Sequence, residues 1–184
     1  MSARKNSHKS HGNRSIFLAV SAMLSLSSVV APAIANGNQD KLLLAAYSQS
    51  DEEAIERTYN KVNQLLKARR AQEAKEILLP ALARYPQCAE LHFQLGNALL
   101  DTEQYQKAVD EYQQALRLKT PFPEAVLNIG YAYVNGGAEL MSIPWFHRYL
   151  RENPNAPDAK DVQAEVLMAH AKAQMKERRF FDAK

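Results

Sequence analysis

Cysteine is nearly absent from the sequence. Among its 184 residues only Cys88 carries a thiol, so a disulfide within the chain is excluded. Stability must then come from the packing of apolar side chains, and a hydrophobic content of 46% is enough for one domain. Cys88 itself is expected to be a small buried thiol at a turn, with a redox or dimer-forming role as the alternative.

Motifs of catalysis and cofactor binding are missing as well. The sequence has no G-x-S-x-G motif, no phosphate-binding glycine loop, no H-E-x-x-H motif and no pair of closely spaced cysteines. Beyond residue 35 the histidines are far apart, at His92, His147 and His170. We therefore expect no catalytic residue, no metal site and no cofactor, and the protein is not expected to be an enzyme.

The sequence has little excess charge outside its first 35 residues. The formal net charge is +3, but this leader holds Arg4, Lys5, Lys9 and Arg14 and no acidic residue. Removing these four from the 23 basic residues leaves 19 against 20 acidic residues, a net charge of −1. Because we find no basic stripe in the remainder, binding of nucleic acid is not expected.

The leader has the layout of a secretory signal peptide. A basic segment precedes the mostly apolar residues 16–35, which end in the small-residue sequence Ala33-Ile34-Ala35. We expect cleavage before Asn36 and export to a bacterial periplasm or secretion. The alternative is an uncleaved leader, whose residues 16–35 are long enough to anchor the chain in the inner membrane. A membrane is an expected partner only if the leader stays uncleaved.

A helical pattern that repeats along the chain follows the leader. Small and aromatic residues within 95–116 fall three, four or seven positions apart, which is the spacing of one helix face. The pattern returns with a period of about 34 residues, which relates Ala108 to Ala74 upstream and Gly96 to Gly130 downstream. The polar residues 101–104 interrupt the apolar pattern of 95–116, which indicates two short helices folded back on each other.

This period and residue pattern resemble the tetratricopeptide repeat, a helix–turn–helix unit. The resemblance places three units, 55–88, 89–122 and 123–156, in a domain of residues 51–156. The central unit is nearly complete, with Leu95, Gly96, Leu99, Tyr105, Ala108, Tyr112 and Ala115. The resemblance implies an all-α fold, a right-handed superhelical solenoid of about three units followed by a C-terminal helix.

The segments on either side of the repeats are predicted from local signals. Residues 36–50 are expected to be a flexible lead-in. Ser50 and Glu53 form a capping box, which predicts that a helix begins at Asp51. Residues 157–184 are expected to form a C-terminal capping helix or a partial fourth repeat.

Helix boundaries inside the array follow from the apolar period and from turn residues. Pro80 is expected to kink or shorten the second helix. Gly136-Gly137 replaces the usual turn of the third unit, which is therefore expected to be the least regular. The predicted helices are 51–67, 71–85, 88–101, 105–118, 122–135 and 140–152.

The resemblance implies binding to another protein or peptide. In this family the first helix of each unit lines a concave groove. The groove positions hold recurring rings, aliphatic side chains and amides, which make the candidate partner-binding site: Tyr59, Asn63, Phe93, Asn97, Leu127 and Tyr131. The alternative is that these residues pack against the next repeat. We predict a non-enzymatic interaction scaffold or adaptor of the cell envelope.

The groove's charges restrict its ligand. Some family members hold a C-terminal carboxylate with lysines and asparagines, but Tyr59 and Glu124 stand where two lysines would be. Glu56, Glu90 and Glu124 repeat at the edge and would repel an acidic tail. The expected ligand is a segment that offers apolar side chains and main-chain amides. Other functions compatible with the sequence are a membrane-anchored assembly factor and the docking module of a larger protein.

Overall fold

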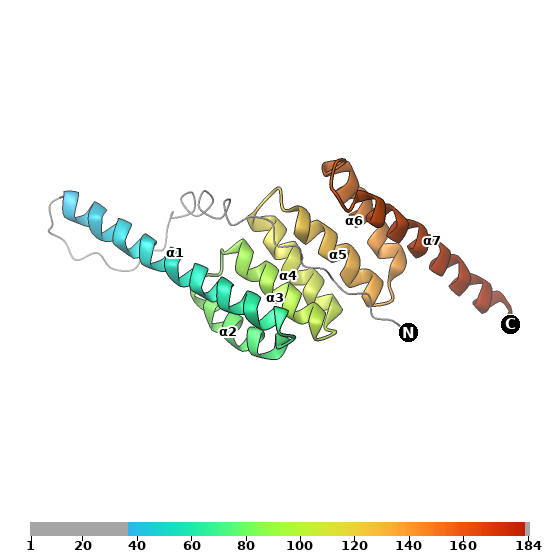
Figure 1. Ribbon diagram of the computed structural model, residues 1–184, viewed down its shortest axis with the longest axis horizontal. Coiled ribbons are helices and arrows are strands. Elements are labelled where there is room, and N and C mark those ends of the chain that lie inside the picture. The colour runs from blue at the N-terminus through green and yellow to red at the C-terminus, as the bar shows by residue number, and fades with distance from the viewer. Residues whose placement is uncertain (1–36, 183–184) are drawn as a thin grey trace. The chain divides into compact units, whose positions relative to one another are not determined.

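The computed structural model describes residues 37–182, and the regular structure in them is helical (Figure 1). The chain divides into two compact units, residues 1–52 and 53–184, and the packing described below lies in the second. The seven helices of the described residues are α1 (Gly37–Lys67), α2 (Ala71–Arg84), α3 (Ala89–Asp101), α4 (Tyr105–Leu118), α5 (Pro123–Asn135), α6 (Glu139–Glu152) and α7 (Ala159–Asp182).

The membrane-related predictions fall outside this range. The leader, residues 1–35, is not among the described residues. Within 37–182, no helix combines the length and the apolar character needed to cross a bilayer.

Helices α2 to α6 begin and end within one residue of the predicted bounds. The predicted helix start at Asp51 is wrong, because α1 begins at Gly37 and passes through Ser50. The backbone of the predicted lead-in is therefore helical from Gly37 onward. Leucines and alanines of high helix propensity lead up to Ser50 with no glycine or proline between them, so nothing forces a new helix to begin there.

Two prolines lie inside helices without ending them. The predicted shortening of the second helix at Pro80 is wrong, because α2 continues to Arg84. Pro144 likewise lies within α6. Both prolines are exposed, so water can bond the carbonyl groups that lose their helical donor.

The turns inside the three repeats share one backbone geometry. Arg69, Glu103 and Gly137 hold the same position in successive repeats, and each has a positive φ, of 61°, 59° and 76°. In the second unit Gln104 N donates to Leu99 O at 2.8 Å, and Glu103 N donates to Leu100 O at 3.1 Å, the two bonds of a Schellman motif. The same pair of bonds closes the other two turns. The third turn is therefore regular, contrary to the prediction.

Close approach of paired helices depends on a glycine facing a ring. A Cβ on Gly96 of α3 would lie 2.5 Å from Tyr112 Cε1 of α4, and a Cβ on Gly130 of α5 would overlap the ring of Phe146 of α6. Tyr112 and Phe146 are fully buried. The missing side chains of Gly96 and Gly130 therefore allow each helix pair to approach closely.

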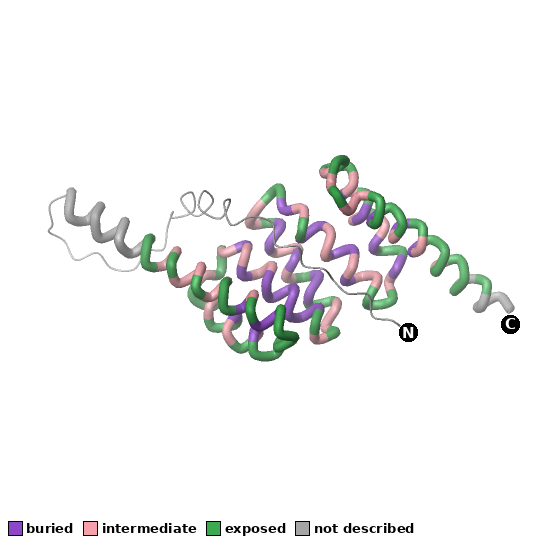
Figure 2. The backbone as a smooth tube through the Cα atoms, in the orientation of Figure 1, coloured by how far each residue is buried: buried purple, intermediate pink, exposed green. Residues whose placement is uncertain are grey.

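Helix α7 packs against α6 and ends the described stack. Val162, Val166 and Ala169 turn one face of it into the core, as the buried positions in Figure 2 show. Near its C-terminal end, Lys176 Nζ donates to Glu139 Oε2 at 2.6 Å and to Gly137 O at 2.8 Å. α7 follows α6 as the first helix of a fourth unit would, but it is a single helix without a turn.

Candidate peptide-binding groove

The six predicted groove residues occupy equivalent places on three first helices. α1 supplies Tyr59 and Asn63, α3 supplies Phe93 and Asn97, and α5 supplies Leu127 and Tyr131. Asn97 is buried and the other five are half-buried. A partner at this face would therefore meet the edges of these side chains.

Phe93 belongs to an aromatic cluster within the second unit, at its border with α5. Its ring centroid lies 4.9 Å from that of Phe122, at the start of α5, and 5.7 Å from that of Tyr112 in α4. Phe122 and Tyr112 are buried, so Phe93 is the half-buried member of the cluster. It contributes both to packing and to the surface of the first helices.

The third unit also has a half-buried ring that packs against a buried one, but at its ninth position. Tyr131 packs edge-on against the buried ring of Phe146, with the centroids 5.3 Å apart. Leu127 packs against the same core while remaining half-buried. Both side chains are held in place by the helix behind them, which limits the conformational entropy that a bound partner would cost them.

The two predicted groove amides, Asn63 and Asn97, take part in hydrogen bonds with neighbouring polar side chains. Gln94 Nε2 donates to Asn63 Oδ1 at 2.7 Å, and Asn97 Nδ2 donates to Gln94 Oε1 at 3.0 Å. Asn97 Oδ1 accepts from the Tyr112 hydroxyl at 2.8 Å and from Asn128 Nδ2 at 2.9 Å. We call these five residues the amide ladder. Both ends of the Asn97 amide are used in it, so the structure gives Asn97 a packing role.

The sequence analysis missed Gln94 and Asn128, although their spacing carried a signal. They lie one repeat apart, as Asn63 and Asn97 do, so each inter-repeat bond joins the ninth position of one unit to the sixth position of the next. A recurring amide at the sixth position could have been noticed. Its partner could not, because the pairing depends on how the helices stack.

The acidic edge of the groove is partly neutralised. Glu90 Oε1 accepts a hydrogen bond from Lys119 Nζ at 2.8 Å, and both side chains are at least half-buried. The Lys119 ammonium also lies 4.8 Å from the centroid of the Phe122 ring, within cation–π range. Glu124 is exposed and Glu56 is half-buried. The expected row of three acids is thus interrupted by one ion pair in its middle.

His92 connects α3 to its surroundings through both ring nitrogens. Nδ1 lies 2.7 Å from Glu111 Oε2 on α4, and Nε2 lies 3.0 Å from the carbonyl oxygen of Pro86. Burial by itself lowers the pKa of His92, but the bonds to Glu111 and Pro86 outweigh burial, and the pKa is raised. The protonated ring can donate to both acceptors at once, which fits a packing role. His147 and His170 lie on α6 and α7, so the three histidines sit on three different helices, as predicted.

Cys88 is a partly buried thiol next to α3. Burial raises its pKa to about 11, and its sulfur lies 3.7 Å from Glu90 Oε2. A thiol with so high a pKa is almost wholly protonated near neutral pH and reacts slowly.

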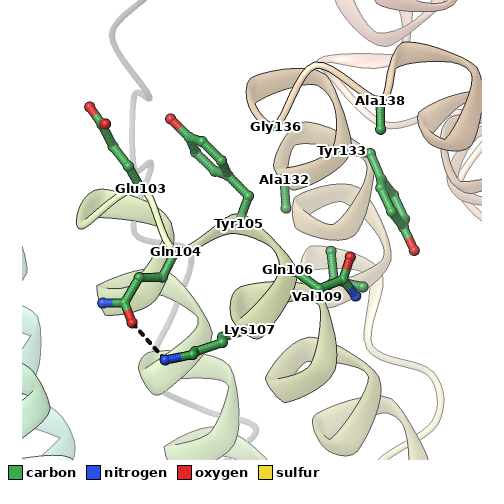
Figure 3. A pocket seen from close by; sticks show the side chains of 10 residues that line it. All are labelled: Glu103, Gln104, Tyr105, Gln106, Lys107, Val109, Ala132, Tyr133, Gly136 and Ala138. Atoms are coloured by element: carbon green, nitrogen blue, oxygen red, sulfur yellow. Dashed lines mark hydrogen bonds between the residues drawn. The ribbon is translucent and has the colours of Figure 1, made fainter.

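Two surface hollows lie apart from the predicted groove. The first, of about 460 Å³, lies between the start of α4 and the end of α5, where Tyr105 and Gly136 come together (Figure 3). Its polar groups include Gln104 and Lys107, which bond each other at 3.2 Å (Figure 3). The second, of about 550 Å³, lies between α6 and α7. Within the described residues, no three acidic, histidine or cysteine side chains are grouped so that they could hold a metal ion.

The family of the chain follows from the repeats and from their match to a known pattern. The family model for the tetratricopeptide repeat matches residues 59–121 and 93–157, which together span more than half of the chain. The chain belongs to the tetratricopeptide repeat family, whose domains are protein–protein interaction modules.

The chain is also similar to an individual protein over part of its length. The chain is 28% identical over 114 residues to the "Beta-barrel assembly-enhancing protease" of Yersinia pestis, a match that includes 62% of this chain and 24% of that protein. The chain thus spans about a quarter of the length of this relative.

Solved structures share the fold. The second tetratricopeptide domain of human RPAP3, determined by NMR with the HSP70 peptide SGPTIEEVD, aligns with a TM-score of 0.55 and 19% identity, covering 61% of this chain and 92% of that domain. SycD, the type III secretion translocator chaperone of Yersinia enterocolitica, aligns with a TM-score of 0.61 and 12% identity. The alignment covers 66% of this chain and 87% of SycD. These similarities confirm the predicted all-α stack of helix–turn–helix units.

Proposed function

We propose that the chain is a non-enzymatic interaction module that binds a peptide or protein segment along the face formed by α1, α3 and α5. The main support is the recurrence of half-buried apolar side chains at the fifth position of each unit, at Tyr59, Phe93 and Leu127. Phe93 and Leu127 are already ordered by packing against the core, so they can offer contact area at low entropic cost. The RPAP3 domain, which shares the fold, was solved with a bound peptide.

The ligand chemistry proposed here is apolar. The amide ladder uses the polar groups of Asn97 internally, which leaves ring and aliphatic edges as the repeated feature of this face. The peptide bound to the RPAP3 domain ends in E-E-V-D. For the present chain we propose a different class of ligand, because Glu124 is exposed at the groove's edge and Tyr59 stands where a lysine would serve a carboxylate.

Peptides selected from a displayed library against the full chain would test the proposal. We expect selected peptides to be rich in apolar residues, and Tyr59→Ala or Leu127→Ala to weaken their binding about fivefold to thirtyfold, as for interface anchors worth about 1–2 kcal/mol. Calorimetric titration would measure the change. Leu79→Ala is a matched control, since Leu79 is 57% exposed on α2 outside this face. Equal weakening by all three substitutions, or by none, would contradict the proposed site.

We also propose that the protein acts in the cell envelope after export. The support is the leader with its Ala33-Ile34-Ala35 cleavage signature. Mass spectrometry of the envelope fraction should find a chain that begins at Asn36. An intact leader in a membrane fraction would favour the membrane-anchored alternative.

A docking module within a larger assembly is a second candidate function. The observation in its favour is the match to the Yersinia pestis protease, of which this chain spans 24%. On this proposal the chain brings an envelope protein to a separate catalytic or assembly component. Co-purification of a single stoichiometric enzyme partner with the full chain would favour it over a free-standing adaptor.

A further inference from the structure

The outward face of α7 corresponds to a face that is covered in the earlier repeats. Leu99 of α3 is covered by α4 and is 6% exposed, whereas Leu167, at the same repeat position two units later, is 71% exposed. Gln163 and Ala164, which correspond to Leu95 and Gly96, are exposed as well. Since α7 is not followed by a second helix among the described residues, this face has the geometry to receive one.

A hollow marks where such a helix would lie. Its walls are His147, Leu150 and Arg151 on α6 and Gln163, Val166 and Leu167 on α7, and its volume is about 550 Å³. Leu150 and Val166 form an apolar floor, and Leu167 stands at the rim. Such a hollow has room for two or three aliphatic side chains of a helix lying along α7.

Arg151 is the one formally charged residue that lines the hollow, and Lys160 lies one helical turn before Gln163 on α7. Arg151 on α6 and Lys160 on α7 are exposed, and neither is part of an ion pair with any residue that the structure describes. The helical spacing places Leu140, Pro144 and His147 on the same face of α6, and Gln163, Leu167, His170 and Gln174 on the same face of α7. Between Lys160 and Gln174 this face of α7 carries no acidic residue, and neither does the corresponding face of α6 between Leu140 and Arg151.

We propose that the hollow between α6 and α7 is a second docking site, which takes an amphipathic helix with an aliphatic face and acidic flanks. The aliphatic face would cover Leu150, Val166 and Leu167, and the acidic flanks would face Arg151 and Lys160. Charge complementarity decides against a second copy of α7 as the occupant, because that helix would bring its own Lys160 and Arg178 to a basic site.

The residue at the eighth repeat position sets the size of the docking side chain. In α3 and α5 this position is glycine, and a ring from the next helix occupies the space of the missing Cβ. α7 has Ala164 there, whose methyl group excludes a ring at the same close approach. The docked helix should therefore present leucine or methionine opposite Ala164 rather than tyrosine or phenylalanine.

Two designed peptides and the full chain would test this site. The first is a fluorescein-labelled helix of about five turns with leucines on one face and glutamates on its flanks; its twin has lysine at every glutamate position. Fluorescence anisotropy should show the acidic peptide binding at least tenfold more tightly than the lysine twin. Its affinity should fall as salt is raised, because screening weakens exposed ion pairs. Replacing the leucine opposite Ala164 with phenylalanine should also weaken it.

Four variants locate the binding. Leu167→Glu and Arg151→Glu should each weaken the acidic peptide at least tenfold, while circular dichroism remains that of the unchanged chain because both residues are exposed. Leu79→Ala and Tyr59→Ala should leave the affinity unchanged, since Leu79 lies on α2 and Tyr59 lies in the groove.

Three results would overturn the proposal. Equal binding of both peptides, or no binding, would show that charge does not select the occupant. Loss of binding in Tyr59→Ala but not in Leu167→Glu would place the peptide in the groove instead. A dimer in sedimentation velocity that Leu167→Glu dissolves would make a second copy of the chain the occupant.

Discussion

Arg69, Glu103 and Gly137 take the same left-handed backbone conformation at the three turns, but only one of them is glycine. A side chain in this conformation brings Cβ too near the carbonyl oxygen, at a cost of about 1–2 kcal/mol. Arg69 and Glu103 therefore carry strain that Gly137 avoids. The Schellman bonds that follow in each turn must hold the two strained residues in place.

Substitutions at these turns should change stability in opposite directions. Gly137→Ala should lower the free energy of unfolding by about 1 kcal/mol from backbone strain alone, because a Cβ there would meet no atom within 4 Å. Glu103→Gly should raise it by about 0.5 kcal/mol, since relief of strain is partly offset by the entropy that glycine adds to the unfolded chain. Urea denaturation would measure both. The same sign for both changes would contradict the strain argument.

The contacts of His92 should make stability depend on pH. Because the pKa of His92 is raised in the folded chain by Glu111 and Pro86 against the effect of burial, its stabilising contribution is full below the unfolded value of about 6.5. That contribution is lost as the pH rises through the folded pKa. Urea midpoints at a series of pH values should show this loss in the unchanged chain and a flatter profile in His92→Gln. Matching profiles for the two chains would assign the dependence to other groups.

At the scale of the helix, Lys176 anchors α7 near its C-terminal end. Lys176 bonds the buried carboxylate of Glu139 and the carbonyl oxygen of Gly137, and the first of these bonds is the main cause of the lowered pKa of Glu139. Among the side chains of α7 that the structure describes, the buried ones, Val162, Val166 and Ala169, lie in its first half. The polar contact of Lys176 therefore holds a part of the helix that lies beyond these apolar contacts.

Removing that contact should loosen only part of the helix. In Lys176→Met we expect hydrogen exchange to speed up at amides 170–176 while amides around Val162 and Val166 stay protected, because local opening follows local contacts. Lys160→Met, at an exposed lysine without that anchoring role, is the matched control. Uniform acceleration along α7 would mean that the helix opens as one piece.

The elements were predictable where the repeat pattern determines them. Five helices were placed within one residue, since small and apolar residues recur in each unit at fixed positions. The start of α1 was not predicted correctly, because Ser50 and Glu53 form a capping box sequence inside a continuous helix. Whether such a sequence caps a helix depends on what precedes it, and no residue of 38–49 is glycine or proline.

The groove was predictable only in part. The recurrence of Tyr59, Phe93 and Leu127 follows from the period, and all three lie half-buried on first helices. The roles of Asn63 and Asn97 did not follow from the sequence, because an amide in a repeat can face either a ligand or the next unit. Which of these two roles the amide takes depends on the distance between stacked helices, and that distance cannot be derived from the sequence.

At the scale of the whole molecule, the amide ladder should make the repeats unfold together. Asn97→Ala should lower the free energy of unfolding by about 2–3 kcal/mol, because it removes one hydrogen bond each from the buried Gln94 and Tyr112 side chains and one from the half-buried Asn128. The slope of urea denaturation should also fall as the repeats uncouple. Asn60→Ala is the control: Asn60 holds the same repeat position as Gln94 but is exposed. If both substitutions lowered the free energy of unfolding equally, the amide ladder would not couple the repeats as proposed.

The charge of the whole chain predicts behaviour with nucleic acid. With residues 1–35 removed the net charge is −1, so the chain should not retain DNA or RNA at physiological salt. The full chain, with its four leader cations, could bind weakly at low salt. Gel-shift assays of both forms would check this, and retention of nucleic acid by the shorter form at physiological salt would contradict it.

The amide ladder also restricts where the array of repeats could be lengthened. Each link needs an asparagine at the ninth position and an amide at the sixth position of the following unit, as in Asn63–Gln94 and Asn97–Asn128. The third unit has Tyr131 at its ninth position, and α7 has the apolar Val162 where the next amide would be. A duplicated middle unit could join the row at both ends, whereas a duplicated last unit could not. A lengthening of the array by internal duplication is therefore compatible with the amide ladder at the second unit and incompatible with it at the third.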